Sequence, residues 1–164
     1  MNKISLALSL LLAACAGAPN NADWSGVIDQ QDARTAKIVE MSRAYCENDS
    51  ETWVKHFAPE ALVKVNDKDL NVEEVTAIYM AGHGVFKDIH HENITCTTMR
   101  YNNGTVWTNY WYDWHGTVRS TGQNLKVRGY ACFRWQDGKV VESYNAFDPT
   151  QYNALAAGTS AELK

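Results

Sequence analysis

Apolar and polar residues alternate with a period of two over residues 125–135. The apolar or small residues of this stretch share one face: Leu125, Val127, Gly129, Ala131, Phe133 and Trp135. Such alternation is typical of an antiparallel strand with one buried face. Similar strands are predicted over 106–115 and 140–147, joined to it by turns over 116–122 and at Asp137-Gly138. Together they predict a long meander whose apolar face must be covered by other elements.

Helical spacing upstream predicts three helices that provide this cover. Apolar residues recur every three or four positions over residues 30–48, 51–57 and 72–86. Asp29 or Asp32 is expected to cap the first helix, because a carboxylate accepts hydrogen bonds from the free N–H groups of a first turn.

The remaining signals place the third helix and the other strands. Asn71 and Glu74 resemble a capping box at the start of the third helix. A short strand is predicted over 61–66 with a turn over 67–69, and a Thr-rich strand over 88–100 leads into the meander. This order favours an α+β fold, in which three N-terminal helices pack on the concave face of a curved, mostly antiparallel sheet.

Composition narrows the function. The chain has 164 residues, a formal net charge of −4 and no run of basic residues, so it suits one domain and argues against a nucleic-acid surface. A positive start, an apolar run over 4–12 and Leu12-Ala13-Ala14-Cys15 resemble a bacterial lipoprotein signal. An ordinary secretory signal with an incidental Cys15 is the alternative.

The lipoprotein interpretation sets the predicted organisation and location. Residues 1–14 form the signal peptide, 15–29 a flexible tether, 30–157 the domain and 158–164 a loose tail. Acyl chains on Cys15 would hold the protein at a membrane of the bacterial cell envelope without spanning it. Since the next residue is not Asp, the expected location in a Gram-negative cell is the periplasmic face of the outer membrane.

The other cysteines and the histidines do not indicate a metal site. Cys46, Cys96 and Cys132 allow either one disulfide with a thiol left over or three buried free thiols. Their spacing does not form a zinc site, and the five histidines show no ligand-spaced cluster. We therefore expect no metal and no cofactor.

One run of residues resembles a known family. Residues 128–142, from Arg128-Gly129 through Asp137-Gly138-Lys139 to Glu142, followed by Asp148 and preceded by Thr121-Gly122, resemble the SnoaL-like branch of the nuclear transport factor 2-like superfamily. The resemblance covers about residues 30–157. It implies a cone with an open end, formed by the curved sheet and its helices. It also implies a homodimer that pairs through the sheets.

The resemblance does not settle the chemistry, because the superfamily contains both enzymes and binding proteins. SnoaL-type cyclases use an Asp on the inner face of the second meander strand as general acid and base. The aligned residue here is Ala131, whose methyl group cannot transfer a proton. A shift of one residue would place Tyr130 or Cys132 there, and neither restores a carboxylate.

Several residues are candidates for the site. Those expected to contact a ligand are Tyr45, Ala131, Phe133, Trp135 and Asn145. Asn145 is the polar residue expected to point inward, with a satisfied core amide as the alternative interpretation. Its position assumes a one-residue bulge at Gly138.

Two pairs of residues are candidates for catalysis. Asp113 and His115 share one face of their strand and would act as an oriented base, or else form an ion pair at the rim or a dimer contact on the convex side. Which face of strand 106–115 points inward is left open. His83 with Tyr79 is the other pair, and a histidine that only caps a helix end is its alternative.

Three functions follow from these observations. The first is a membrane-tethered domain that binds a small apolar or amphipathic molecule in its cone. The second is an enzyme of cyclase, isomerase, dehydratase or hydrolase type acting on such a molecule. The third is a dimeric assembly module that uses exposed aromatic residues of the sheet.

Overall fold

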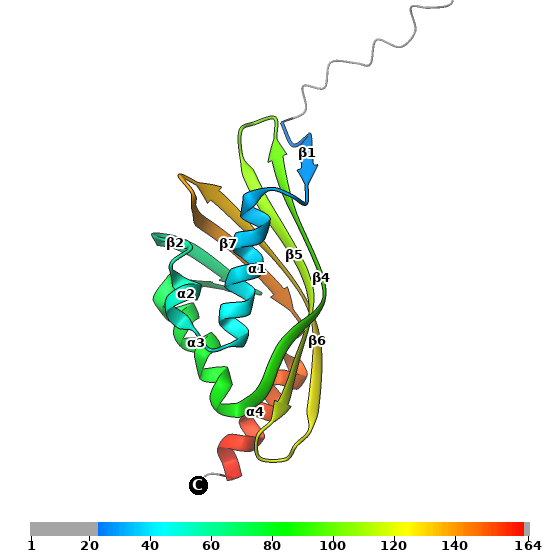
Figure 1. Cartoon of the computed structure of the whole chain (residues 1–164). Coiled ribbons are helices and arrows are strands. Elements are labelled where there is room, and N and C mark those ends of the chain that lie inside the picture. Colours follow the sequence, from blue (N-terminus) through cyan, green and yellow to red (C-terminus); the bar gives the residue numbers. More distant parts are fainter. Residues whose placement is uncertain (1–22, 163–164) are drawn as a thin grey trace, which may run out of the picture.

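The computed structural model describes residues 23–162 and shows an α+β fold with one curved sheet (Figure 1). The elements in chain order are β1 (Gly26–Asp29), α1 (Ala33–Cys46), α2 (Ser50–Val54), β2 (Phe57–Val65), β3 (Lys68–Leu70), α3 (Val72–Val85), β4 (Phe86–Tyr101), β5 (Val106–Val118), β6 (Asn124–Gln136), β7 (Lys139–Phe147) and α4 (Thr150–Glu162). The predicted signal peptide and Cys15 lie outside the described residues. None of the helices within 23–162 is long and apolar enough to cross a membrane.

The sheet has seven strands in the order β1-β4-β5-β6-β7-β2-β3. The predicted meander is confirmed, because β4, β5, β6 and β7 pair with their chain neighbours in antiparallel fashion. β2 pairs with β7 in parallel, and β3 pairs with β2 in a hairpin. The sheet is therefore mostly antiparallel, as expected, with one parallel pair.

Local sequence signals account for the helix starts. Asp32, one of the two predicted caps, is the N-cap of α1. Its carboxylate accepts a hydrogen bond from the backbone N–H of Arg34 at 2.9 Å. The predicted capping box of α3 is confirmed, with Asn71 and Glu74 each accepting a backbone N–H of the other at 2.9 Å.

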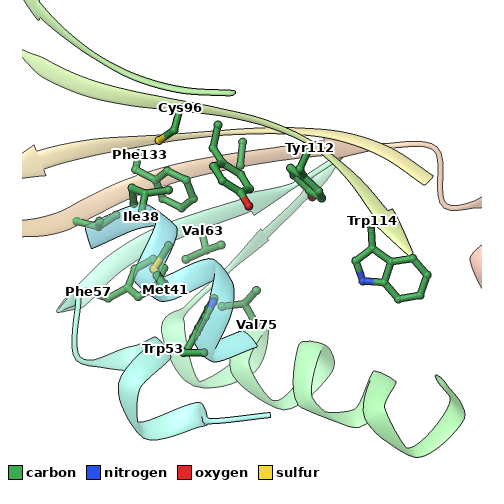
Figure 2. Packing of buried hydrophobic residues seen from close by; sticks show 14 of the residues in the cluster. Ile38, Met41, Trp53, Phe57, Val63, Val75, Cys96, Tyr112, Trp114 and Phe133 are labelled. Atoms are coloured by element: carbon green, nitrogen blue, oxygen red, sulfur yellow. The ribbon is translucent and has the colours of Figure 1, made fainter. Parts of the chain in front are cut away.

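Helix α1 lies across the concave side of the sheet, where it forms one wall of the cone (Figure 1). Its Ile38 and Met41 are buried and point toward the strands, opposite Phe133 of β6 (Figure 2). α3 adds Val75, which is fully buried, and α2 adds Trp53. The cone is thus closed by apolar contacts between helices and the inner face of the sheet.

The helix predictions need two corrections. The second helix ends at Val54 rather than Phe57, because Phe57 starts β2 and pairs with Val140 of β7. This helix packs against α1 and α3 rather than covering the sheet by itself. A fourth helix, α4, extends into the predicted loose tail at the C-terminal end, and the ring of Tyr152 lies 4.8 Å from that of Phe86.

The predicted tether contains a strand. β1, Gly26–Asp29, pairs with the end of β4, although residues 15–29 were expected to be flexible. Val27 and Ile28 are 62% and 63% exposed. Because β1 is an exposed edge strand held by backbone pairing, no alternation of buried and exposed residues marks it in the sequence.

One turn and one bulge lie at other positions than predicted. β5 continues to Val118, beyond the predicted turn at Gly116. The bulge in β7 lies at Val141, between the pairs Arg134↔Glu142 and Trp135↔Val140, and not at Gly138. Gly138 instead takes a φ of 78° in the β6–β7 turn, after Asp137 at 49°, which suits a tight hairpin.

Cys46, Cys96 and Cys132 are free thiols in the described part of the chain. The second alternative is right in that all three thiols are free, but only Cys96 is buried, while Cys46 and Cys132 are half-buried. Burial raises the pKa of the Cys46 thiol to about 11 and that of Cys96 to about 12. Neither is therefore a ready nucleophile at neutral pH.

Candidate ligand-binding site

The cone encloses a cavity of about 340 Å³ between α1, α3 and the inner face of the sheet. Its walls are mainly apolar and aromatic, and include Ile38, Met41, Trp53, Phe57, Val63 and Phe133 (Figure 2). The β2–β3 turn with Asp67 and Lys68, both exposed, lies at its rim. A cavity of this size with a few polar groups has the character of a small-molecule site.

The structure decides which face of β5 points inward. Tyr110, Tyr112 and Trp114 line the cavity. Asp113 and His115, two of the candidate catalytic residues, alternate with them and so lie on the convex face, away from the cavity. Both faces of this strand carry aromatic residues, so the sequence does not show which is buried. Packing of the helices on the concave side buries the face with Tyr110, Tyr112 and Trp114.

Asp113 belongs to a polar network on the convex side. Its carboxylate accepts hydrogen bonds from Lys126 at 2.9 Å, Arg128 at 3.1 Å and Asn93 at 2.8 Å. The Lys126 contact, followed by those of Asn93 and Arg128, lowers the pKa of Asp113 far below its usual range. This is the ion-pair alternative stated for that residue. Its carboxylate is fully engaged and remote from the cavity.

The centre of the sheet brings three residues together on the inner face. Tyr110 pairs with Ala131, and Ala131 pairs with Asn145 on β7. Ala131 is 4% exposed and lines the cavity, so its small side chain leaves the space that a bulkier residue would fill. No carboxylate occupies this position.

A first polar group, the His91 cluster, consists of Ser42 on α1, His91 on β4 and Tyr110 on β5. Ser42 Oγ lies 2.8 Å from His91 Nδ1 and 2.5 Å from the Tyr110 hydroxyl, which is itself 3.1 Å from His91 Nδ1. The imidazole stacks on Tyr112 with 4.3 Å between ring centroids. The cluster thus holds the ring of His91 in one orientation at the cavity wall.

His91 is neutral over the physiological range. Burial, with smaller contributions from His90 and His115, lowers its pKa to about 3. Its Nε2 is buried and has no hydrogen-bond partner within the described residues. A buried polar atom without a partner is unfavourable by about 1–3 kcal/mol.

A second polar group, the Asn145 cluster, consists of Tyr79, Tyr112 and Asn145. The Tyr112 hydroxyl donates to Asn145 Oδ1 at 3.0 Å, and Asn145 Nδ2 donates to the Tyr79 hydroxyl oxygen. Tyr79 therefore keeps its own hydroxyl hydrogen for another acceptor. Burial raises the pKa of Tyr79 above its usual range and that of Tyr112 to about 12, so both stay protonated.

Tyr45 on α1 and His83 on α3 are in contact. Trp114 Nε1 donates to the Tyr45 hydroxyl at 2.9 Å, which leaves the Tyr45 hydroxyl hydrogen available at the cavity wall. His83 Nε2 donates to the backbone carbonyl of Tyr45 at 2.8 Å. His83 thus holds the end of α1 and does not line the cavity. The alternative interpretation assumed that His83 caps its own helix, α3. In the structure it contacts the neighbouring helix, α1.

The candidate residues are thus divided between cavity and core. Tyr45, Tyr79, Ala131, Phe133 and Asn145 line the cavity. Trp135 shares their face but is buried in the core, where its Nε1 donates to Thr108 Oγ1 at 2.9 Å. It lies outside the cavity wall because the strand runs past the end of the cavity.

Sequence reasoning missed the His91 cluster. His90-His91 signalled that at most one of two adjacent histidines would point inward, but not which one. Ser42 and Tyr110 come from elements 68 residues apart in the chain and meet only through packing of α1 on β5.

Gly129 makes room for the Asn145 cluster. A Cβ at this position would lie 2.3 Å from Cζ of Tyr112. We expect Gly129→Ala to displace the Tyr112 ring, break its bond to Asn145 and lower the free energy of unfolding by about 1–3 kcal/mol. Urea unfolding measures this change.

Gly84→Ala is the matched control, because a Cβ there meets nothing within 4 Å and Gly84 lies in α3. It should leave stability unchanged or raise it by up to about 1 kcal/mol. Equal effects of the two substitutions would show that Tyr112 is not confined by Gly129.

A curved sheet and helices that enclose an apolar cavity, open at one end, define a cone of the nuclear transport factor 2-like type. The profile of the SnoaL-like domain family matches residues 38–143, and the chain belongs to this family. No functionally curated protein matches the sequence significantly.

Solved structures share the fold at low identity. A candidate polyketide cyclase from Xanthomonas campestris pv. campestris is 16% identical with a TM-score of 0.61, over 74% of this chain and 94% of that one. A candidate hydroxylase from Streptomyces galilaeus is 21% identical with a TM-score of 0.60, over 76% and 96%. A candidate isomerase from Bacillus subtilis is 16% identical with a TM-score of 0.56, over 75% and 91%. At these identities the likeness concerns the fold.

Proposed function

We propose that the protein binds a small, largely apolar molecule that carries an oxygen acceptor, such as a ketone or a hydroxyl group. The observation that carries the proposal is the cavity of about 340 Å³, whose apolar walls bear Tyr45 and Tyr79. Their hydroxyl oxygens accept from Trp114 and Asn145, so each hydroxyl hydrogen remains for a ligand. Apolar walls supply affinity, and a few oriented polar groups select the ligand.

The same geometry favours binding over proton transfer. Asp67 is the acidic residue at the cavity and lies exposed at its rim, while Ala131 occupies the position where SnoaL-type cyclases carry an acid. His91 is the remaining candidate base, but a group with a pKa of about 3 accepts a proton poorly near neutral pH.

Catalysis of cyclase or isomerase type is the alternative. The observation in its favour is the His91 cluster, where an imidazole and two hydroxyl groups meet at the cavity wall. The candidate cyclases and isomerase of similar fold add weak support. In this case Tyr79 would donate to the developing oxyanion of the substrate.

Two parts of the proposal rest on the sequence. Lipidation of Cys15 would attach the protein to a membrane of the bacterial cell envelope. Pairing of two copies through the convex face of the sheet would form a homodimer. The second has support from Trp111 and Tyr144, whose side chains are 43% and 38% exposed on that face.

Native mass spectrometry tests the proposed binding. The protein is purified gently from its own host, and its mass is measured before and after denaturation. We expect a bound small molecule that is released on denaturation and identifies the ligand class. Incubating that compound with the protein then separates binding from turnover. As a test ligand we use 2-naphthol, an apolar phenol. The proposal is contradicted if no molecule copurifies and the protein does not bind 2-naphthol.

Tyr79→Phe should weaken 2-naphthol binding about tenfold, because one hydrogen bond in a dry cavity is lost. Isothermal titration calorimetry measures this. Tyr144→Phe removes the same hydroxyl group from the convex face and should bind as the wild type does. Equal losses of affinity in both variants would show that the Tyr79 hydroxyl group does not contact the ligand.

A further inference from the structure

We propose that His90, Glu92 and His115 form a binding site for a divalent transition-metal ion, represented by Zn²⁺, on the convex face of the sheet. One ligand atom from each residue lies within 4.8 Å of the others. The site is on the other side of the sheet from the cavity, so its test does not depend on the proposed ligand binding.

Strand pairing assembles the three side chains. His90 on β4 lies directly opposite His115 on β5, and their rings stack with 4.9 Å between centroids. Glu92 follows His90 by two residues and therefore shares its face. His91, between them, points to the cavity. The cluster is not evident in the sequence because Glu92 and His115 are 23 positions apart in the chain.

The distances suit tetrahedral coordination. His90 Nε2 lies 3.4 Å from Glu92 Oε1, and His115 Nε2 lies 3.3 Å from Glu92 Oε2. Ligand atoms bound to Zn²⁺ at 2.0–2.1 Å in a tetrahedron are about 3.3 Å apart. Small rotations of exposed side chains are enough to direct the three atoms at one ion.

The tautomer of His90 is set by its backbone. Its Nδ1 lies 2.8 Å from the carbonyl oxygen of Asp88, which can only accept, so Nδ1 carries the proton. This leaves Nε2 as the ring nitrogen available to a metal ion, 3.4 Å from a carboxylate oxygen of Glu92. A backbone carbonyl that fixes a histidine in this way is the usual second shell of a metal ligand.

His115 adds an independent sign of a missing partner. Its Nε2 is buried and forms no hydrogen bond within the described residues. Lys126, which lies opposite His115 on β6, does not compete for Glu92, because its Nζ is bound to Asp113 at 2.9 Å. The lysine charge is therefore balanced outside the cluster.

Ligand type selects the ion. Two imidazole nitrogens and one carboxylate suit Zn²⁺ and its neighbours in the first transition row, whereas Mg²⁺ and Ca²⁺ prefer all-oxygen sites. The side chains of His90 and Glu92 are 53% exposed, so ions reach the site and water completes the coordination.

The full chain, freed of metal with a chelator, is titrated with ZnCl₂ by calorimetry. Glu92→Gln and His115→Gln, which alter different strands, should each weaken binding of one ion per chain about tenfold or more. Glu40→Gln is the matched control, because Glu40 is a half-buried carboxylate that contacts one histidine, His56, and no second one among the described residues. It should bind Zn²⁺ as the wild type does.

Thermal unfolding gives a second readout. Zn²⁺ should raise the unfolding midpoint of the wild type and of Glu40→Gln but not that of Glu92→Gln, while the metal-free proteins show that each variant folds. A wild type that binds no Zn²⁺ would overturn the proposal. Zn²⁺ binding that is unchanged in both Glu92→Gln and His115→Gln would also overturn it, since the ion would then lie elsewhere.

Discussion

Ala131→Phe is expected to abolish ligand binding by the cone. Ala131 is 4% exposed and lines the cavity between Tyr110 and Asn145. A phenyl ring at this position takes up the space in which the ligand would lie, so affinity for 2-naphthol should fall about a hundredfold or more. Calorimetry measures the loss, and native mass spectrometry of the variant should show no copurified molecule.

Ala146→Phe is the matched control for this experiment. Ala146 is the next residue to Asn145 on β7 but is exposed on the other face of the sheet. The same added ring there leaves the cavity open, and binding should persist. If Ala131→Phe binds 2-naphthol with the affinity of Ala146→Phe, the cavity is not the binding site.

His91 should make the fold sensitive to acid. Burial lowers its pKa from 6.5 to about 3, so the unfolded chain takes up a proton in this range while the native state does not. Stability therefore falls as pH decreases from 6.5 toward 3, by about 4 kcal/mol from this residue alone. Above pH 6.5 the contribution vanishes, because both states are neutral.

Urea unfolding of the wild type and of His91→Phe over this pH range measures the effect. Phenylalanine keeps a ring beside Tyr112 but does not titrate. Carboxylates titrate alike in both proteins, so the difference in free energy of unfolding isolates His91. This difference should shift in favour of the variant as pH falls below 6.5. Parallel curves for the two proteins would contradict the low pKa.

The two expectations rest on different properties of one cavity. Ala131 limits the space in the cavity, and the burial that lowers the pKa of His91 makes it a poor base. The proposed recognition of a small molecule rests on both.

Local patterns in the sequence determined much of the fold. The alternation over 125–135 predicted which face of β6 is buried, and the structure agrees from Leu125 to Trp135. Asn71 and Glu74 predicted the start of α3. These predictions succeed because strand periodicity and helix capping depend on residues a few positions apart. The run from Arg128 to Glu142 also identified the family.

Tertiary structure decided what local patterns leave open. The two faces of β5 are similarly aromatic, so packing against α1 selected Tyr110 and Tyr112 for the cavity and left Asp113 outside. Pairing of β2 with β7 and the position of α4 depend on contacts between distant segments.

The candidate sites divide in the same way. The sequence by itself placed Ala131 on the buried face of its strand, because alternation along a strand fixes which side chains share a face. It placed Asn145 on that side only by assuming a bulge at Gly138, whereas the bulge lies at Val141. It did not bring Ser42 to His91, or His115 to Glu92. Those groups meet only when α1 lies on the sheet and β4 pairs with β5, because their closeness depends on the folded chain and not on spacing along it.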